Sequence, residues 1–275
     1  MKIYVFGSTG MLGAYISTYL NSVKKNIVEL TRNDLDVNNL SHSLINNLFE
    51  KLNITKEDII INCIGIIPQS NSIISTTKCN YYKINAIFPI ILNTICEKNG
   101  CKFIHITTDC VYSGDKGNYN ENDEHDEKND YGVSKSLGEL CTNATIIRTS
   151  IIGEEKKNKY SLLEWVIKNK NGHINGYSNH YWNGVTCLQL SKIINKIIDN
   201  NLYWNGVRHI FSPKVVSKKD LCTYISNVYN LNIQVNEYDA NDNINKSLTT
   251  IYKDNSLLNI PDIYNQLIEL KNYHL

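Results

Sequence analysis

The chain has 275 residues, a hydrophobic content of 42% and a formal net charge of +1. This length and composition fit a globular protein with one large domain, or with a main domain and a smaller lobe. The near-neutral charge gives no reason to expect nucleic acid or a membrane surface as a partner.

The sequence has no run of about 18 apolar residues, and the apolar start at residues 2–6 is too short for a secretory signal. The eight cysteines are scattered, with no Cys-x-x-Cys pair and no Cys/His spacing typical of metal ligands. We therefore expect free thiols in a reducing compartment, a cytoplasmic protein and no metal site.

The first predicted strand, residues 2–6, is followed by three regularly spaced glycines and a helical pattern to about residue 23. This order is typical of a dinucleotide-binding domain, although the spacing is Gly-x-x-Gly-x-x-Gly and not Gly-x-Gly-x-x-Gly. Gly7 permits the turn, Gly10 lets the backbone approach a pyrophosphate, and Gly13 lets the helix pack closely. The pyrophosphate would lie at the helix N-terminus. The predicted cofactor contacts here are Gly7, Thr9, Gly10, Met11, Leu12 and Gly13.

The second predicted strand, residues 26–31, ends at Arg32 and not at an acidic residue. An acidic residue would favour NAD, whereas an arginine can pair with a 2′-phosphate. Arg32 therefore favours NADPH, with a solvated arginine as the alternative. Asp36 and Val37 follow in a position suited to flank the adenine.

Ser41 is placed to cap a helix that runs to about residue 52. The next buried strand, residues 58–63, ends where a cofactor that crosses the carboxyl edge of a parallel sheet would pass. We therefore predict further cofactor contacts from Cys63, Ile64 and Gly65.

Residues 76–97 have a mostly helical pattern, and the fourth strand, residues 102–107, leads into Thr108 and Asp109. Polar groups at the carboxyl end of a central strand are where doubly wound sheets bind their substrates, so both residues are candidate substrate contacts. We interpret the acidic segment that follows, residues 118–129, as a solvated loop and not as a metal site.

The next helix, capped by Asp130, carries Tyr131 and Lys135. Residues four apart lie on one face of a helix. A phenol beside an ammonium group has a pKa lowered by about 1–3 units from its free value of about 10. The pair is thus a candidate acid for the reduction of a carbonyl. The alternative is a surface helix with one tyrosine and one lysine.

Strands and helices alternate up to a strand at residues 144–149, which predicts a doubly wound parallel sheet of the Rossmann α/β class. We assign an NAD(P)-binding domain to residues 1–150. Residues 151–275 would form mainly a smaller α/β substrate lobe, with some segments returning to the main sheet. The helices predicted there span residues 161–170 and 186–199, and short elements are expected near residues 207–211, 218–229 and 262–271.

Residues 176–184 are rich in aromatic and amide groups and have little apolar periodicity. Such a loop can stack on a flat ring and bond hydroxyl groups, so Trp182 and Asn183 are candidate substrate contacts. Core packing of the tyrosines and the tryptophan is the alternative.

With these residues in place, the chain resembles the extended short-chain dehydrogenase/reductase family, and within it the dTDP-4-dehydrorhamnose reductase branch. The resemblance covers essentially the whole chain. Four stretches carry it: Gly7-x-x-Gly10-x-x-Gly13, Thr108-Asp109-x-Val-Tyr112, Tyr131-Gly-x-Ser-Lys135 with Gly138-Glu139, and Arg148-Thr149-Ser150.

The resemblance implies that Tyr131 protonates the substrate oxygen as a hydride arrives from the nicotinamide. It implies that Lys135 holds the nicotinamide ribose and lowers the pKa of the tyrosine, and that Thr108 hydrogen-bonds the same oxygen. The implied cofactor is NADPH, with NADH left open. The implied substrate is a nucleotide-linked 4-keto-6-deoxyhexose, reduced to an L-rhamnose-type sugar.

Cys110 departs from the pattern of related 4,6-dehydratases, in which an acidic residue follows the position of Asp109. This argues against dehydration. Reductases that also epimerise carry a cysteine two residues after the catalytic hydroxyl, as Cys110 stands after Thr108. A bifunctional 3,5-epimerase/4-reductase, with His173 or His180 as the second proton carrier, therefore stays open beside a packed thiol.

A non-catalytic member, similar to the regulatory subunit of methionine adenosyltransferase, is a further alternative, against which the intact Thr108, Tyr131 and Lys135 argue. The stretch 182–186 departs from the Gly-x-Pro-Thr-like sequence of thymidine-linked enzymes. The nucleotide (dTDP, UDP or GDP) and a 2-acetamido group, as in a UDP-N-acetyl-L-rhamnosamine route, therefore stay open. A homodimer is also left open.

Overall fold

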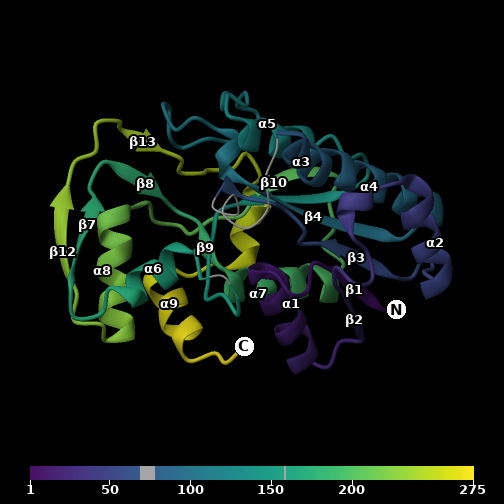
Figure 1. Ribbon diagram of the computed structural model, residues 1–275, viewed down its shortest axis with the longest axis horizontal. Helices are drawn as coiled ribbons and strands as arrows, with labels where there is room; N and C mark the ends of the chain where they lie inside the picture. Colours follow the sequence, from purple (N-terminus) through teal and green to yellow (C-terminus); the bar gives the residue numbers. More distant parts are fainter. Residues whose placement is uncertain (69–77, 158) are drawn as a thin grey trace.

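A computed structural model describes residues 1–68, 78–157 and 159–275. Two lobes lie side by side along the long axis of the molecule (Figure 1). The larger lobe is built on a parallel sheet, and the smaller lobe surrounds β7 (His173–Tyr177), α8 (Lys218–Tyr229) and β12 (Gln234–Tyr238). In the described residues no helix combines the length and the apolar character that a membrane span requires.

The main sheet has the strand order β10-β5-β4-β3-β1-β2, and every neighbouring pair is parallel. The strands are β1 (Ile3–Phe6), β2 (Ile27–Leu30), β3 (Ile59–Asn62), β4 (Lys102–Thr108), β5 (Thr145–Thr149) and β10 (Gly206–His209). The order reverses between β1 and β3, because the chain first adds β2 outside β1 and then crosses to β3. Ligands of doubly wound sheets bind at such a switch point.

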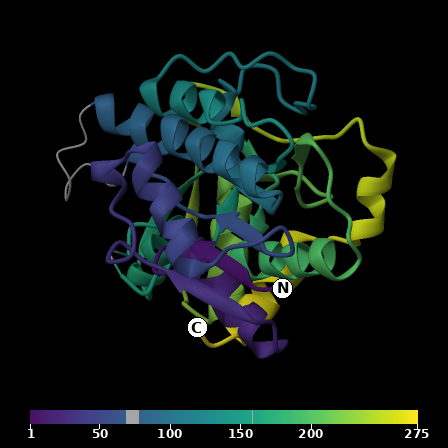
Figure 2. The ribbon, with the colours of Figure 1, turned by 90° about the vertical axis from the view of Figure 1, so that its right-hand side faces the viewer.

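Both faces of the sheet are covered, as the continuous apolar runs of its strands predict. Ile3 and Val5 face a core shared with α1 (Met11–Ser22) and α7 (Cys187–Asp199). Tyr4 and Phe6 face a second core with α2 (His42–Leu52) and α4 (Phe88–Asn99). Figure 2 shows the blue helices of residues 42–99 on one side of the strands and the purple α1 on the other. The predicted Rossmann α/β fold is confirmed.

The helical stretch predicted at residues 76–97 is divided into three parts in the described residues. It consists of α3 (Lys78–Tyr82), a π-helical turn η3 (Lys83–Ile87) and α4, and it lasts to Asn99. Residues 76 and 77 lie outside the described residues. The π-helical turn was not predicted, and such turns are frequent at functional sites.

The cap predicted for α5 (Asp130–Leu137) was wrong by one residue. The Asn129 side chain accepts a hydrogen bond from the Gly132 N–H at 2.8 Å and is the N-cap. Asp130 lies in the first turn, where it accepts from the Tyr82 hydroxyl at 3.1 Å. The cap predicted at Ser41 is confirmed, because its hydroxyl accepts from the Leu44 N–H.

The smaller lobe contains strands where a loop was predicted at residues 176–184. β7 pairs with β12, and β8 (His180–Trp182) pairs with β11 (Val216–Ser217) and β13 (Ile244–Asn245). The lobe also contains α6 (Leu162–Lys168) and α9 (Ile263–Lys271), and β6 (Ile151–Ile152) pairs with β9 (Val185–Thr186). Two C-terminal segments return to the main sheet: β10 extends it beside β5, and α7 packs against α1.

The acidic segment, residues 118–129, is held in place by hydrogen bonds and is not freely solvated. Glu121 accepts hydrogen bonds at 2.9 Å from the backbone N–H groups of His209 and Ile251. Asp126 accepts at 2.7 Å from the N–H of Ser113. These bonds fix the segment over residues that are distant in the sequence. In the described part of the chain, no group of three or more His, Cys, Asp or Glu residues is arranged to hold a metal ion.

Candidate active site

The glycine turn, residues 7–13, connects β1 to α1. Gly7 has a φ of +79°, a conformation that favours glycine. A Cβ on Gly13 would lie 2.1 Å from the Gly7 carbonyl oxygen, so α1 can begin this close to the turn only with glycine there. Gly10 is the N-cap and brings no side chain to the helix end. The first N–H groups of α1 are therefore open to an anion such as a pyrophosphate.

The other predicted residues of the glycine turn differ in exposure. Thr9 is exposed and Met11 is half-buried, whereas Leu12 is buried in the core between α1 and the sheet. Leu12 can thus offer a cofactor only its backbone, while Thr9 can also offer its hydroxyl.

The residues predicted around the adenosine end follow β2. Arg32 is exposed, and within the described residues its guanidinium has no hydrogen-bond or ion-pair partner, so it is available to an external phosphate. The Asp36 carboxylate accepts from the Asn38 N–H at 3.0 Å and caps η1 (Val37–Asn39). Val37 is buried. Asp36 thus stabilises the start of this loop, and the Arg32 guanidinium is the charged group there that can bind a phosphate.

The segment after β3 meets the middle of α5. A Cβ on Gly65 would lie 3.0 Å from Lys135 Nζ, so Gly65 leaves room for the ammonium group. Burial raises the pKa of the Cys63 thiol to about 12, and the nearby Lys135 ammonium group opposes this rise. Ile64 donates its N–H to the Asn62 side chain at 3.0 Å. Residues 63–65 therefore lie beside the Lys135 side chain, and their contact with a cofactor stays a prediction.

Asn85, in the π-helical turn, is a site residue that the sequence did not reveal. Its amide accepts from the Ile66 N–H at 3.0 Å and donates to the Ile66 carbonyl at 3.1 Å. It also donates to Ser134 Oγ at 3.1 Å. Asn85 thus connects the loop after β3 to α5. An asparagine inside a helical pattern is the signal for it, and the asparagine-rich composition hid that signal.

Thr108 and Tyr131 come together because α5 begins against the end of β4. A Cβ on Gly132 would lie 2.5 Å from the Cys110 carbonyl oxygen, so glycine permits this approach. Burial raises the pKa of the Tyr131 phenol, and a hydrogen bond with the Thr108 hydroxyl opposes this rise. The Tyr81 ring packs edge-on at 6.2 Å from the Tyr131 ring. Two hydroxyl groups thus meet at the carboxyl edge of the sheet.

The expected lowering of the Tyr131 pKa by Lys135 was wrong. Burial raises the pKa of the phenol well above its ordinary value, and neighbouring Cys110 raises it further. Burial also lowers the pKa of the Lys135 ammonium to about 8, against the opposing effect of Glu139. Desolvation outweighs the effect of neighbouring charges for both groups. The phenol is consequently protonated at neutral pH.

Asp109 is buried and faces two lysines that the sequence did not single out. Its carboxylate accepts from the Thr108 hydroxyl at 3.1 Å. Burial raises its pKa, while Lys218 and Lys246 both oppose this rise. Lys246 is ion-paired to Glu127 at 3.2 Å. These lysines are far away in the sequence, and nothing in their local pattern distinguishes them from surface lysines.

Among the described residues the Cys110 thiol has no hydrogen bond to a histidine, and a role of His173 or His180 as second proton carrier stays a prediction. The Cys110 thiol lies 3.6 Å from Asp109 Oδ1, and burial raises its pKa to about 12. The cations near it are Lys246, Lys218 and Lys135. His180 is bonded instead to the Asp242 carbonyl at 3.2 Å, and both His173 and His180 line a cavity in the smaller lobe.

Trp182 and Asn183 are both buried, at 4% and 3% exposure. The Asn183 amide donates to the Leu248 carbonyl and accepts from the Leu248 N–H, both at 2.8 Å. It therefore connects two segments of the protein, and its predicted substrate contact was wrong. One face of the Trp182 ring lies under the Lys218 ammonium, 5.0 Å from the ring centroid.

A buried ion pair supports the far end of α5. Arg148 and Glu139 are joined by two hydrogen bonds, with side-chain exposures of 2% and 4%. Arg148 also donates to the Tyr112 hydroxyl at 2.5 Å and contacts a nitrogen of His209 at 2.8 Å. Three of the stretches that carry the family resemblance therefore form one internal network.

Comparison with known proteins agrees with this fold. The family model described as the RmlD substrate binding domain matches residues 1–247. Spore coat polysaccharide biosynthesis protein SpsK of Bacillus subtilis is 32% identical over 164 residues, which are 54% of this chain and 52% of SpsK. The dTDP-4-dehydrorhamnose reductase of Mycobacterium tuberculosis is 24% identical over 156 residues, 55% and 48% of the two chains. The chain thus spans about half the length of these curated relatives.

The crystal structure of dTDP-4-dehydrorhamnose reductase from Bacillus anthracis, in complex with NADP, superposes with a TM-score of 0.80. The two chains are 22% identical, and the superposition covers 98% of each. The parallel sheet with its smaller lobe is therefore the fold of these reductases. Since the family model extends over residues 1–247, the chain belongs to the RmlD substrate binding domain family.

Proposed function

We propose that this chain reduces the 4-keto group of a nucleotide-activated 4-keto-6-deoxyhexose with NADPH. The product would be an L-rhamnose-type nucleotide sugar linked to dTDP or UDP, with UDP-N-acetyl-L-rhamnosamine included. The observation that carries the proposal is the meeting of Thr108 with Tyr131 beside the buried Lys135. SpsK takes its name from polysaccharide biosynthesis, and we propose that the product enters such a pathway.

The residues of this site suit the delivery of a proton to a ketone. Because burial keeps the Tyr131 phenol protonated, a proton is available at neutral pH. Thr108 hydrogen-bonds the phenol and favours the phenolate that is left after proton transfer. A positioned acid of this kind contributes about 10²- to 10⁴-fold to a reaction rate.

The chain also fits a phosphorylated dinucleotide. The glycine turn and the open N-terminus of α1 suit a pyrophosphate, and the exposed Arg32 suits a 2′-phosphate. When bound, NADPH supplies the hydride. We expect Arg32→Ala to raise the KM for NADPH about tenfold and to leave the KM for NADH unchanged. Equal use of both cofactors by the wild type would contradict the assignment of Arg32.

Turnover tests the proposal directly. Oxidation of NADPH is followed with the 4-keto-6-deoxyglucose derivatives of dTDP and UDP, and with the 2-acetamido analogue of the UDP sugar. Reduction of any of these supports the proposal and identifies the nucleotide. If none is reduced, a non-catalytic binding role similar to that of a regulatory subunit becomes the better explanation.

A bifunctional epimerase and reductase is a second candidate, favoured by the Cys110 thiol near Lys246. Epimerisation requires a proton to leave and return at C3 or C5 of the sugar. Solvent deuterium would then appear at these carbons with the wild type and disappear with Cys110→Ser. Reduction without exchange would leave a plain 4-ketoreductase.

A further inference from the structure

Two asparagines hold the backbone on either side of Gly65. The Asn62 side-chain oxygen accepts a hydrogen bond from the Ile64 N–H at 3.0 Å. The Asn85 side-chain oxygen accepts one from the Ile66 N–H, also at 3.0 Å. The three residues between these asparagines that follow Cys63, residues 64–66, form the Gly65 loop.

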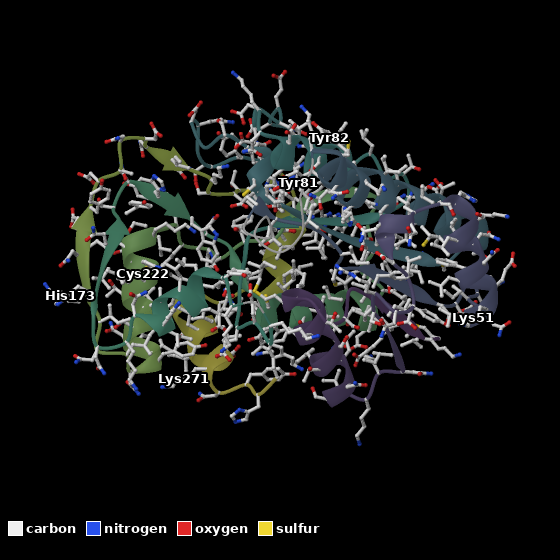
Figure 3. All side chains as sticks on the ribbon, viewed as in Figure 1. Lys51, Tyr81, Tyr82, His173, Cys222 and Lys271 are labelled. Carbon is white, nitrogen blue, oxygen red and sulfur yellow. The ribbon has the colours of Figure 1, made fainter. Side chains whose placement is uncertain are left out.

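The Gly65 loop lies beside the helix that carries the candidate acid. An added Cβ on Gly65 would be 3.0 Å from Lys135 Nζ. The Tyr81 ring, labelled in Figure 3, packs on Tyr131 from the helical stretch that also carries Asn85. The position of this loop therefore affects how closely the Lys135 ammonium group is enclosed.

His105 determines the orientation of the Asn62 amide. The two residues are partners in the register of β3 and β4, and Asn62 Nδ2 lies 3.2 Å from His105 Nδ1. Because Asn62 Oδ1 accepts from the Ile64 N–H, the amide group that faces the imidazole is the NH₂ group, which is a donor. Nδ1 of His105 must therefore be the unprotonated nitrogen, and the proton is on Nε2.

The surroundings of His105 favour this neutral tautomer. The side chain is buried, and its ring stacks on Phe103 with centroids 6.0 Å apart. Burial, together with the smaller effect of the Lys135 charge, lowers the pKa of the imidazole to about 3. The ring is therefore neutral at neutral pH and presents an acceptor to Asn62.

We propose that His105 is a positioning residue that acts through the Asn62 amide on the Gly65 loop. The loop in turn positions NADPH and encloses the Lys135 ammonium group. This inference rests on the proposed function, in which the cofactor crosses the edge of the sheet at this loop. Without an acceptor at Nδ1, Asn62 has a buried N–H group with no partner, and its bond to the Ile64 N–H weakens. The loop then shifts, which weakens NADPH binding and admits water to Lys135.

Three variants are compared with the wild type. His105→Leu removes the acceptor. In His105→Asn the side-chain oxygen can take the place of Nδ1, so this variant should restore the bond. Phe103→Leu is the control, because it removes the partner of the ring stack in the same buried layer and no hydrogen bond.

Titration of NADPH in the absence of a sugar substrate tests the inference. We expect His105→Leu to weaken NADPH binding about tenfold. His105→Asn and Phe103→Leu should bind NADPH as the wild type does. His105→Gln has its amide at the position of Nε2 and no acceptor at that of Nδ1. It replaces His105→Leu, with the same expected result, if His105→Leu melts at a lower temperature than Phe103→Leu.

The pH profile of kcat/KM is a second measurement, which a loss of packing alone would not change. Burial lowers the pKa of Lys135 to about 8, so water that enters beside Gly65 raises this pKa. We expect the descending limb to move from near pH 8 to a higher pH in His105→Leu. It should stay in place in His105→Asn and Phe103→Leu.

Equal affinity of the wild type and His105→Leu for NADPH would overturn the inference. So would a descending limb that stays near pH 8 in His105→Leu, or equal losses of affinity in His105→Leu and either of the other two variants. Turnover separates the two hypotheses: reduction of a nucleotide sugar with unaltered NADPH binding in His105→Leu refutes only the role of His105. Absence of turnover, with NADPH binding that depends on His105, refutes only the proposed reduction.

Discussion

The Lys135 ammonium lies against Gly65, where an added Cβ would be 3.0 Å from Nζ. This contact joins the middle of α5 to the segment that follows β3. Because β3 lies beside β1 at the switch point of the sheet, the contact also brings Lys135 to the edge that carries the glycine turn. One lysine therefore connects the candidate cofactor site to the helix that carries Tyr131.

Activity and stability should depend on pH in opposite directions through Lys135. Its pKa is lowered to about 8, so the ammonium is lost as the pH rises through 8. We expect kcat/KM for NADPH to fall above this pH. The unfolded lysine has a pKa of about 10.4, so the unfolded state binds more protons between the two values, and stability rises with pH there.

Two measurements check this prediction. The pH profile of kcat/KM should show a descending limb near pH 8, and Lys135→Met should lack it. The free energy of unfolding of the wild type, relative to that of Lys135→Met, should increase from pH 8 to 10. A wild-type profile that is flat to pH 10 would contradict the assignment of this ammonium group to the active site.

Substitutions in the glycine turn should separate folding from cofactor binding. A Cβ on Gly13 would lie 2.1 Å from the Gly7 carbonyl oxygen, whereas a Cβ on Gly10 would lie 3.3 Å from it. Gly13→Ala should lower the free energy of unfolding by about 1–3 kcal/mol or more, because backbone must move. Gly10→Ala should fold normally and bind NADPH more weakly.

Thermal unfolding and NADPH titration of the two variants check this. If Gly10→Ala bound NADPH as tightly as the wild type, the pyrophosphate would not pass over Gly10.

The ion pair of Arg148 and Glu139 should be important for stability. Both side chains are almost fully buried, so Glu139→Gln leaves an unpaired buried guanidinium. Loss of one partner of a buried pair costs about 3–5 kcal/mol. The control is Glu269→Gln, which breaks a half-exposed pair with Lys192. Such pairs contribute at most about 1 kcal/mol. Urea unfolding measures the free energy of unfolding of both variants. An equal decrease in Glu139→Gln and Glu269→Gln would refute the structural role of the buried pair.

The main sheet could be predicted from the sequence because its strands are buried on both faces. Residues 3–6 and 59–61 are continuous apolar runs, and each becomes a central strand. Helix α7 was predicted at residues 186–199 and spans Cys187–Asp199, since its apolar residues recur with helical spacing. The pattern of apolar residues within each segment was therefore enough to predict these elements.

The smaller lobe was harder to predict because its strands are short and half-exposed. In β7 exposed and buried residues alternate, but a buried glycine, Gly176, interrupts the apolar pattern. Its pairing with β12 joins segments about 60 residues apart. Sequence spacing does not reveal such a partner.

The chemistry of the site depends on tertiary contacts in the same way. The spacing of Tyr131 and Lys135 predicts one helix face, yet burial decides the pKa of each group. Asn85 and Ser134 are 49 positions apart and meet only in the fold. The same holds for Lys218 and Asp109, which are distant in the sequence.

Tyr131→Phe tests the central claim most directly. The substitution removes the phenol oxygen and leaves the ring that packs against Tyr81. Single-turnover oxidation of NADPH by a 4-keto-6-deoxyhexose nucleotide is measured for the wild type and for the variant. We predict that the rate falls about 10²- to 10⁴-fold and that the affinity for NADPH is unchanged. An undiminished rate in Tyr131→Phe would show that another group supplies the proton and would contradict the account.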